Sequence, residues 1–199
     1  MKKIVIIGSG IVGICTAVEL INRGFSVTVI DPNEPGSQTS YGNAGVLTDT
    51  SLMIINNPQL LRSLLSLIFK KKTSFIYSKL FVFSRLFWVI NFLMFSKTKH
   101  MELAAQVLRE LQVLSLKTHK KLINKTKSND NIESPGWLKV FKTPLSFEKY
   151  AYELDILDKN KAEYTLLNTG EIKKQFPDLQ IEYYKGVLFK NSLRVKSPI

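Results

Sequence analysis

The sequence predicts an α/β fold whose N-terminal part is a parallel βαβ unit, and three observations support this prediction. An apolar run at residues 4–7 leads into a glycine-rich turn at residues 8–13. A second β-branched run, residues 27–30, ends at Asp31. Between the two runs, apolar residues recur at helical spacing on one predicted sheet-facing side: Ile14, Ala17, Val18 and Ile21. Two buried parallel strands joined by a helix therefore open the chain.

The turn between the first strand and the helix has the spacing Gly-x-Gly-x-x-Gly, which is typical of dinucleotide-binding βαβ units. Gly8 permits the tight turn, Gly10 lets the backbone approach a pyrophosphate, and Gly13 lets the helix pack against the strand. The free N–H groups and the positive dipole end of the helix attract the same pyrophosphate. Asp31, at the end of the second strand, is suited to accept hydrogen bonds from both ribose hydroxyls, and its charge disfavours a 2′-phosphate.

The first eighteen residues also fit a second interpretation, a secretion signal, because Met1-Lys2-Lys3 precedes an apolar stretch. Glu19 follows without a small-residue cleavage site, and Ile14 stands before Cys15 where lipoprotein processing requires a small residue. The single cysteine cannot form an internal disulfide, which allows a reducing compartment. We therefore expect a cytoplasmic protein.

A polar loop, residues 32–50, follows Asp31 in place of another short helix and strand. Its segment Thr39-Ser40-Tyr41-Gly42-Asn43-Ala44-Gly45 offers hydroxyls, a side-chain amide and glycine N–H groups. Such a segment suits contacts with a phosphate or a flavin. An ordinary polar turn explains the same composition, and both interpretations remain open.

The GSGIVG turn, the Val-Thr-Val-Ile-Asp strand and the Thr-Ser-x-x-Asn-Ala-Gly loop, in this order, resemble the flavin-dependent amino-acid oxidoreductase family, and within it the D-amino acid dehydrogenases. The resemblance implies FAD as the cofactor. It places the turn on the pyrophosphate, Asp31 on the ribose, and four loop residues near the pyrophosphate and the flavin. The cofactor-binding residues that it implies are Gly8, Ser9, Gly10, Ile11, Val12, Gly13, Asp31, Ser40, Asn43, Ala44 and Gly45.

The family's reaction, as the resemblance implies it, is oxidative deamination of an amino acid to a 2-oxo acid, with hydride transfer from Cα to the flavin. The substrate would be a small amine or amino acid. In complete members the arginine and tyrosine that hold the substrate come after the part that resembles this chain, so no catalytic residue is named. We expect an incomplete fold that is inactive alone and is completed by a second chain. The alternative is a non-catalytic FAD- or NAD-binding remnant, or a membrane-associated fragment.

Three parts are predicted along the chain. Residues 1–50 form the FAD-binding βαβ unit and flavin loop, residues 51–128 a basic, apolar helical segment, and residues 129–199 the start of a mixed α+β substrate domain. The absence of Gly and Pro over long stretches predicts helices at about 57–70, 74–96 and 100–127. The sequences Gly-Trp-Leu-Lys-Val-Phe and Gly-Val-Leu-Phe predict two strands in the last part, with Trp137, Tyr183 and Tyr184 as flavin-pocket or core residues.

Residues 51–128 carry fourteen basic and two acidic side chains, which accounts for the whole net charge of +12. Their apolar stretch Phe75–Phe95 is long enough to span a bilayer, but Arg85 at its midpoint costs about 2.5–3.5 kcal/mol there. An interfacial or core position is favoured. The lysines suit peripheral contact with an anionic membrane, although an AT-rich genome would produce the same lysine bias.

No other partner or metal site is predicted. His100 and His119 have no nearby Cys or acidic cluster at ligand spacing, so we expect no metal site. The sequence contains no recognised nucleic-acid-binding module, and its aromatic residues cluster in an apolar helix. We therefore expect no nucleic-acid partner.

Overall fold

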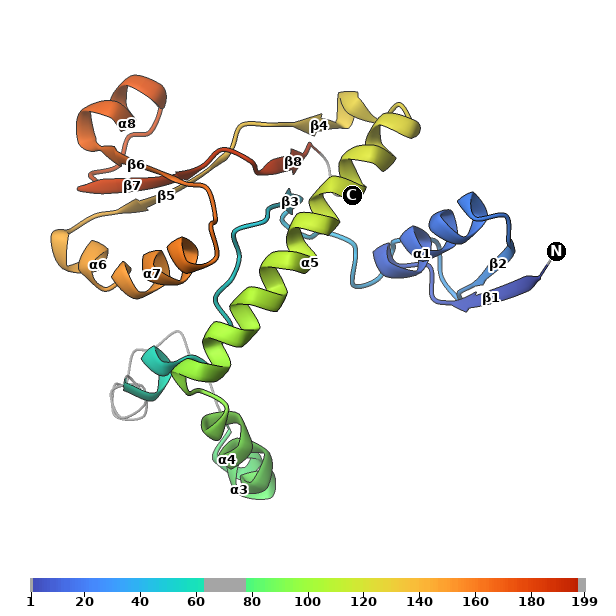
Figure 1. Ribbon diagram of the computed structural model, residues 1–199, viewed down its shortest axis with the longest axis horizontal. Helices are drawn as coiled ribbons and strands as arrows, with labels where there is room; N and C mark the ends of the chain where they lie inside the picture. The colour runs from blue at the N-terminus through green and yellow to red at the C-terminus, as the bar shows by residue number, and fades with distance from the viewer. Residues whose placement is uncertain (1, 63–77, 197–199) are drawn as a thin grey trace. The chain divides into compact units, whose positions relative to one another are not determined.

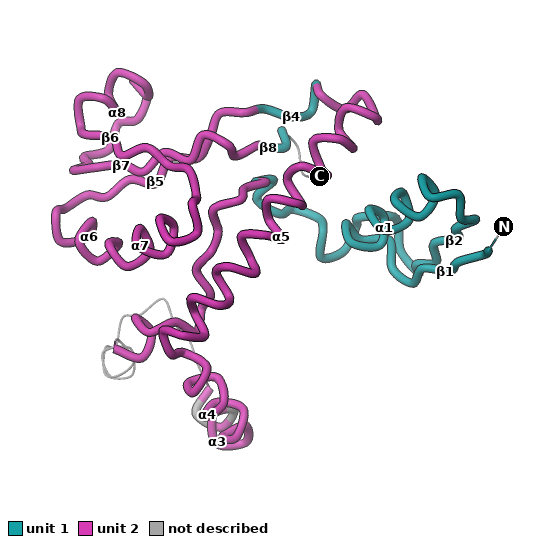
Figure 2. The backbone as a smooth tube through the Cα atoms, viewed as in Figure 1, with its two compact units in different colours: residues 1–46, 130–133, 194–199 teal, residues 47–129, 134–193 magenta. Residues whose placement is uncertain are grey.

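The computed structural model describes residues 2–62 and 78–196, and the chain divides into two compact units (Figure 2). Unit 1 comprises Met1–Val46, Asp130–Glu133 and Arg194–Ile199, and unit 2 comprises Leu47–Asn129 and Ser134–Leu193. Both units combine helices and strands, so the predicted mixed α/β class is confirmed.

Unit 1 opens with the predicted βαβ unit: strand β1 (Lys3–Ile7), helix α1 (Ile11–Asn22) and strand β2 (Ser26–Ile30) (Figure 1). The two strands are parallel, and Ile4 pairs with Val27. Ala17 of α1 is buried, as predicted. The prediction for Ile21 is wrong, since this residue is 56% exposed. It lies in the last turn of α1, directly before the end of the helix.

A small sheet in the order β3-β8-β4 joins the loop after β2 to the last described residues. It consists of β3 (Val46–Leu47), β4 (Ile132–Glu133) and β8 (Leu193–Val195), with β4 and β8 antiparallel. The N–H of Val195 donates to the Gly45 carbonyl at 2.7 Å. A 3₁₀ turn, η1 (Asn129–Asn131), precedes β4.

The helical part of the chain is less continuous than the sequence predicts. Residues 58–62 are helical, residue 57 lies in the bend before them, and residues 63–70 of the predicted helix lie outside the described residues. In place of one helix over 74–96, the described residues form α3 (Lys79–Ser84) and α4 (Leu86–Met94), separated at Arg85 with φ −122°. The break leaves Arg85 exposed instead of enclosed by apolar side chains. Helix α5 (Thr98–Lys125) confirms the third prediction.

Unit 2 contains an antiparallel sheet in the order β5-β7-β6. Its strands are β5 (Trp137–Phe141), β6 (Thr165–Asn168) and β7 (Lys185–Phe189), and its helices are α6 (Pro144–Glu148), α7 (Ala151–Lys159) and α8 (Thr169–Gln175). The predicted strands at 136–141 and 186–189 are thus confirmed.

Alternate residues of β7 point to opposite faces of this sheet, as strand geometry requires. Val187 packs in one apolar cluster with Ile156 of α7 and Met101 of α5. Leu188 packs in the other cluster with Ile172 of α8. The sheet is therefore covered on both faces (Figure 1), which explains the nearly continuous burial of β7.

Gly13 provides a direct test of the packing in unit 1. A Cβ atom at this position would lie 1.9 Å from the Gly8 carbonyl oxygen, so Gly13→Ala forces the helix away from the turn. Alanine in a helix normally gains up to about 1 kcal/mol over glycine. Here we expect a loss of at least about 2 kcal/mol in the free energy of unfolding of unit 1, measured by hydrogen exchange of the β1 and β2 amides.

The matched control is Val12→Ala, one residue earlier in the same helix and 77% exposed in the wild type. It should change the same free energy by less than about 0.5 kcal/mol. Equal changes in the free energy of unfolding of unit 1 for the two variants would show that the close contact at Gly13 does not limit the packing of α1 on the turn.

Candidate functional site

The glycine turn of unit 1 has the geometry that brings a backbone close to a ligand. Gly8 adopts φ +102°, a conformation that favours glycine, and its N–H donates to the Ile30 carbonyl at 2.8 Å. Gly13 lies against the carbonyl oxygen of Gly8 and leaves no space for a side chain. The first turn of α1 is open to solvent, with Ile11 57% and Val12 77% exposed. The turn is therefore held tightly on its strand side and free on its outer side.

Asp31 ties the end of β2 to this turn. Its Oδ2 accepts the N–H of Ser9 at 2.8 Å, and its Oδ1 accepts the N–H of Asn33 at 2.8 Å. These two backbone N–H groups, that of Ser9 foremost, hold the pKa of the Asp31 carboxyl below its ordinary value. A charged carboxylate has about four acceptor positions, so lone pairs remain for two ribose hydroxyls.

A cavity of about 200 Å³ lies between the turn and the loop after β2. On its helix side, the Ser40 hydroxyl oxygen accepts the N–H of Ile11 at 3.0 Å. A Cβ on Gly10 would lie 3.3 Å from this same oxygen. The residues that line the cavity are Gly10, Asp31, Glu34, Gly36, Ser37, Gln38, Thr39 and Ser40.

Ser9 supplies a further sign that the turn is built for a polar ligand. This residue is 4% exposed, and its hydroxyl has no hydrogen-bond partner among the described residues. Its carbonyl accepts the N–H of Gly36 at 3.1 Å, which draws the loop over the turn. Ser9 itself does not line the cavity; Gly10, which has no side chain, and the helix N-terminus fit a pyrophosphate group there.

The three remaining loop residues of the sequence prediction do not line this cavity. The Asn43 side chain donates to the Ser40 carbonyl at 2.8 Å and accepts the Gly45 N–H at 2.6 Å, so its amide shapes the loop itself. Ala44 is exposed. Gly45 is buried at φ +63°. Their contacts fix the position of Ser40 and the start of β3.

The sequence analysis did not single out four residues that line the cavity: Glu34, Gly36, Ser37 and Gln38. The available signal was the spacing between Asp31 and Ser40. A loop of this length that returns to the helix N-terminus must pass over the glycine turn. Gly36, at φ +76°, marks the bend that makes this return possible.

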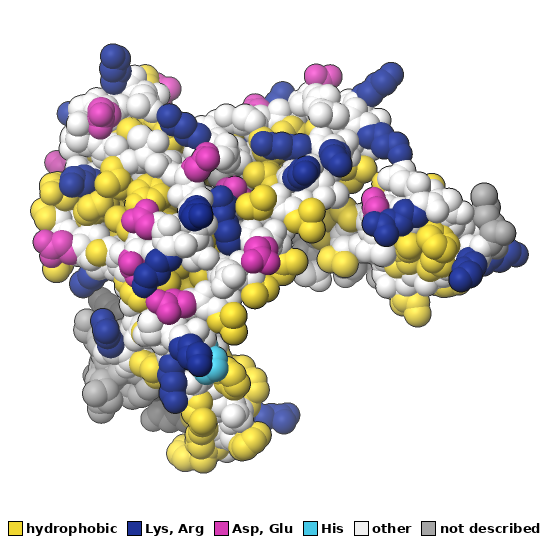
Figure 3. All heavy atoms as spheres, in the orientation of Figure 1, with side chains coloured by type: hydrophobic (Ala, Val, Ile, Leu, Met, Phe, Trp, Pro, Cys, Tyr) yellow, Lys and Arg dark blue, Asp and Glu magenta, His cyan; other side chains and the backbone are white. Residues whose placement is uncertain are grey.

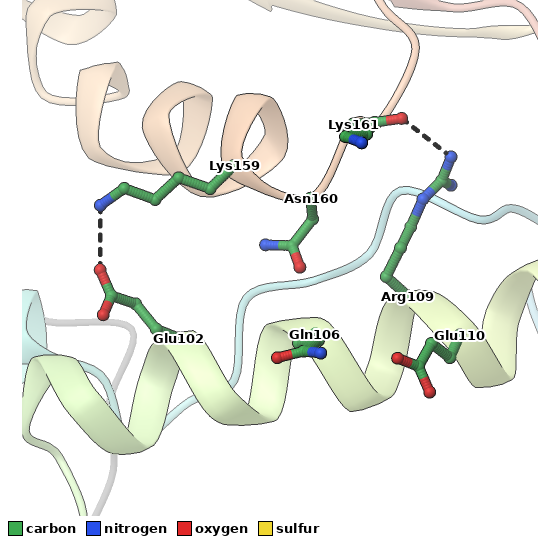
Figure 4. Close-up of a pocket in the computed structure, with 7 residues that line it drawn as sticks. All are labelled: Glu102, Gln106, Arg109, Glu110, Lys159, Asn160 and Lys161. Carbon is green, nitrogen blue, oxygen red and sulfur yellow. Dashed lines mark hydrogen bonds and ion pairs between the residues drawn. The ribbon is translucent and has the colours of Figure 1, made fainter.

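A larger cavity, of about 630 Å³, belongs to unit 2 and lies between α5 and the end of α7 (Figure 4). Lys159 pairs with Glu102 at 2.9 Å, and Arg109 donates to the Lys161 carbonyl at 3.2 Å. Arg109 also pairs with Asp49 at 2.7 Å. These contacts connect α5 to the end of α7 and to the segment before α5.

The aromatic candidates of unit 2 fall in two environments. Tyr183 is buried in the cluster with Ile172, whereas Trp137 and Tyr184 are 41% and 39% exposed. Tyr183 and Tyr184 line a cavity of about 600 Å³. Within residues 2–62 and 78–196, no group of three His, Cys, Asp or Glu side chains has the arrangement of a metal site. Burial raises the pKa of the Cys15 thiol, which makes it less reactive.

Residues 3–198 match the model of the family described as FAD dependent oxidoreductase (DAO). The chain belongs to this family. The resemblance inferred from the turn, strand and loop is thereby confirmed. A D-amino-acid oxidase of Bradyrhizobium diazoefficiens is 29% identical over an alignment 208 positions long. This alignment covers 99% of this chain and 47% of that protein. A D-amino acid dehydrogenase of Helicobacter pylori is 24% identical over 194 residues, 98% of this chain and 46% of that protein.

The chain spans about half the length of the curated relatives that it matches. Among solved structures, glycine oxidase from Geobacillus kaustophilus has the same fold over 100% of this chain and 42% of its own, with a TM-score of 0.62 and 15% identity. The family is FAD-dependent, and the donor set around the glycine turn fits the pyrophosphate and ribose of that cofactor.

The cavity can be tested at Gly10. Gly10→Val adds a branched side chain 3.3 Å or less from Ser40 Oγ and fills the space at the helix N-terminus. We expect at least about a hundredfold loss of FAD affinity by fluorescence titration, because the backbone can no longer approach the phosphates. Gly170→Ala is the matched control, since its Cβ meets the Asn168 side-chain oxygen at the same 3.3 Å in unit 2. Equal FAD affinity of Gly10→Val and the wild type would contradict the site.

The charge on Asp31 gives a pH dependence with a defined sign. A carboxyl whose pKa is lowered by folding stabilises the fold above its unfolded pKa of about 3.9, and this stabilisation is lost as the pH falls through the folded value. Asp31→Asn should therefore destabilise unit 1 above about pH 5, and the difference from the wild type should shrink in stronger acid. Hydrogen exchange of the β1 amides measures it.

The control is Glu34→Gln, which changes a carboxylate of the same cavity that accepts neither the Ser9 nor the Asn33 N–H. It should leave unit 1 as stable as the wild type at neutral pH. If the difference in the free energy of unfolding of unit 1 between Asp31→Asn and the wild type grew as the pH fell, the role of Asp31 would be refuted.

Proposed function

We propose that unit 1 binds FAD at its glycine turn and that the chain is the flavin-binding part of an amino-acid oxidoreductase of the D-amino acid dehydrogenase type. The reaction is the oxidative deamination of an amino acid to a 2-oxo acid and ammonia. The observation that carries the proposal is the cavity where Gly10, Asp31 and Ser40 meet at the N-terminus of α1. FAD, when bound, supplies the hydride acceptor for this reaction.

The chain's own residues act by holding the cofactor. The N–H groups of the first turn of α1 and the hydroxyls of Ser9 and Ser40 would hold the pyrophosphate, and Asp31 would hold the ribose. Ile11, Val12 and the loop residues Asn43–Gly45 belong to the proposed contact region, where Asn43 keeps Ser40 in place. Such fixed contacts align a hydride donor and acceptor, which contributes about 7–11 kcal/mol to barrier lowering in well-oriented reactions.

The substrate class is supported by the relatives, which are named as oxidases and dehydrogenases of D-amino acids. The sheet of unit 2 is proposed as the beginning of the substrate domain over residues 129–199, after the helical segment 51–128. The residues that bind the substrate and those that carry out catalysis are not assigned to positions of this chain.

A second polypeptide segment that completes the flavin domain is part of the proposal. One face of the β1–β2 sheet presents Val5, Ile7 and Ile30 at 60%, 89% and 54% exposure. A parallel pair of strands needs cover on both faces, because parallel strands are apolar on both sides. We expect the chain to deaminate amino acids only when this face is covered.

The location that we propose is cytoplasmic, with peripheral contact at the inner face of the membrane. The basic segment 51–128 supports this contact, because it carries the whole charge excess. None of the described helices combines the length and the apolar character that crossing a bilayer requires.

The cofactor choice tests the proposed function. We expect the chain to bind FAD at least about tenfold more tightly than FMN, which lacks the adenosine half, and to bind NADP poorly, because its 2′-phosphate would face Asp31. Equilibrium competition against a fluorescent FAD measures the order. In the comparison variant Asp31→Asn, the affinities for NADP and NAD should differ less than in the wild type. Tighter binding of FMN or NADP by the wild type would refute the assignment.

A further inference from the structure

The two short helices that precede α5 in unit 2 carry many exposed apolar side chains. Leu80 and Phe83 of α3 are 80% and 77% exposed, and Phe87 and Trp88 of α4 are 81% and 57% exposed. Ile90, Met94 and Phe95 add further exposed apolar surface, at 47%, 54% and 51%. Figure 3 shows hydrophobic side chains over the part of unit 2 that α3 and α4 form. A patch of this kind marks a binding surface.

The patch is held to unit 2 at its base. Ser96, directly after α4, is 0% exposed, and its hydroxyl donates to the Phe92 carbonyl at 3.1 Å. The Phe95 ring lies 4.8 Å from the His100 ring on α5, and Met101 is fully buried. The Trp88 ring stacks on Phe92 at 5.3 Å. The end of α4 and the start of α5 are therefore fixed in unit 2, whereas the side chains of the patch stay exposed.

The charges around the patch have one sign. No acidic residue occurs between Asp49 and Glu102 in the sequence. Arg85 is exposed between α3 and α4, and Lys97 and Lys99 are exposed where α5 begins. A second copy of this surface would bring like charges together, whereas an anionic surface would neutralise them. Phe and Trp bordered by Lys and Arg are typical of segments that lie at the membrane interface.

We propose that α3 and α4 insert into the interfacial layer of an anionic phospholipid membrane. Phe83, Phe87 and Trp88 enter the boundary of the acyl chains, and Arg85 and Lys97 pair with the headgroups. The proposal rests on the peripheral contact proposed above and adds the inserting element and the lipid class. With six and nine residues, the helices are about 9 and 14 Å long, well short of a hydrocarbon core of about 30 Å. They therefore lie in the interface.

The chain contains two tryptophans, Trp88 and Trp137, so Trp137→Phe makes Trp88 the sole reporter. This full-length variant is mixed with vesicles of phosphatidylcholine, with and without phosphatidylglycerol, and with lipids brominated along the acyl chain. Binding is measured by co-sedimentation, and insertion by the blue shift and bromine quenching of Trp88 emission. We expect both signals with phosphatidylglycerol vesicles, weakening as salt is added, and little binding to phosphatidylcholine alone.

In the same background, Phe83→Ser with Phe87→Ser should lower vesicle affinity at least about tenfold, because two exposed aromatic side chains no longer enter the lipid. The matched control is Leu111→Ser with Leu114→Ser. It removes two apolar side chains of α5, outside the patch, that are 58% and 60% exposed. The control should keep wild-type affinity. Circular dichroism verifies that both variants remain folded.

The outcomes separate the two proposals. Sedimentation with anionic vesicles without quenching of Trp88 would overturn insertion and leave a purely electrostatic contact. No sedimentation would overturn both the contact and the insertion, while FAD binding remains a separate measurement. Self-association without lipid that Phe83→Ser with Phe87→Ser abolishes would assign the patch to a second copy and overturn the proposal.

Discussion

The hydrogen bond from the Ser9 N–H to the Asp31 carboxylate, 2.8 Å long, is the interaction on which the candidate site depends. It connects the end of β2 to the turn after β1, so the two parallel strands and the glycine turn form one rigid piece. The carboxylate also fixes the start of the following loop through the Asn33 N–H. That loop then returns to α1, where Ser40 meets the Ile11 N–H. Asp31 thus connects the glycine turn to the start of the loop that closes the cavity.

Unit 2 depends on a different constraint, the close approach of α8 to its sheet. A Cβ on Gly186 of β7 would lie 2.9 Å from Ile172 and 3.0 Å from Leu138. Glycine at this position lets α8 lie directly on the strand, and the Asn168 side chain caps the helix by accepting the Glu171 N–H. The sheet is thereby closed on both faces, whereas apolar side chains stay exposed on β1, β2, α3 and α4. These open surfaces are where we propose that the molecule meets a second polypeptide and a lipid surface.

Local sequence signals were sufficient for the elements that positioned the site. The glycine spacing and the β-branched runs predicted β1, α1 and β2, and Trp137–Phe141 predicted β5, because these patterns arise from backbone sterics and from burial on a regular period. Position-specific packing was not predictable in the same way. Ile21 has the helical spacing of a core residue but is exposed, and Arg85 divides a stretch whose composition favours one helix.

The residues that line the cavity could not be predicted from sequence patterns either. Residues between Asp31 and Ser40 carry no periodic pattern, and their placement follows from Gly36 and from backbone hydrogen bonds that form only in the folded unit. The Asn43 amide forms two hydrogen bonds within the loop, which hold Ser40 and Gly45 in place. A sequence motif identifies the chemistry of such a loop, whereas tertiary contacts decide which of its members face the ligand.

The measurement that tests this account most directly is amide hydrogen exchange of the full chain with and without FAD. The account predicts that FAD slows exchange at the amides of residues 8–13 and 36–40, where the turn and the returning loop enclose the cavity. Exchange in β5 and β7 of unit 2 should not change. Protection confined to unit 2, or no protection of the glycine turn at saturating FAD, would contradict the central claim that unit 1 receives the cofactor between Gly10, Asp31 and Ser40.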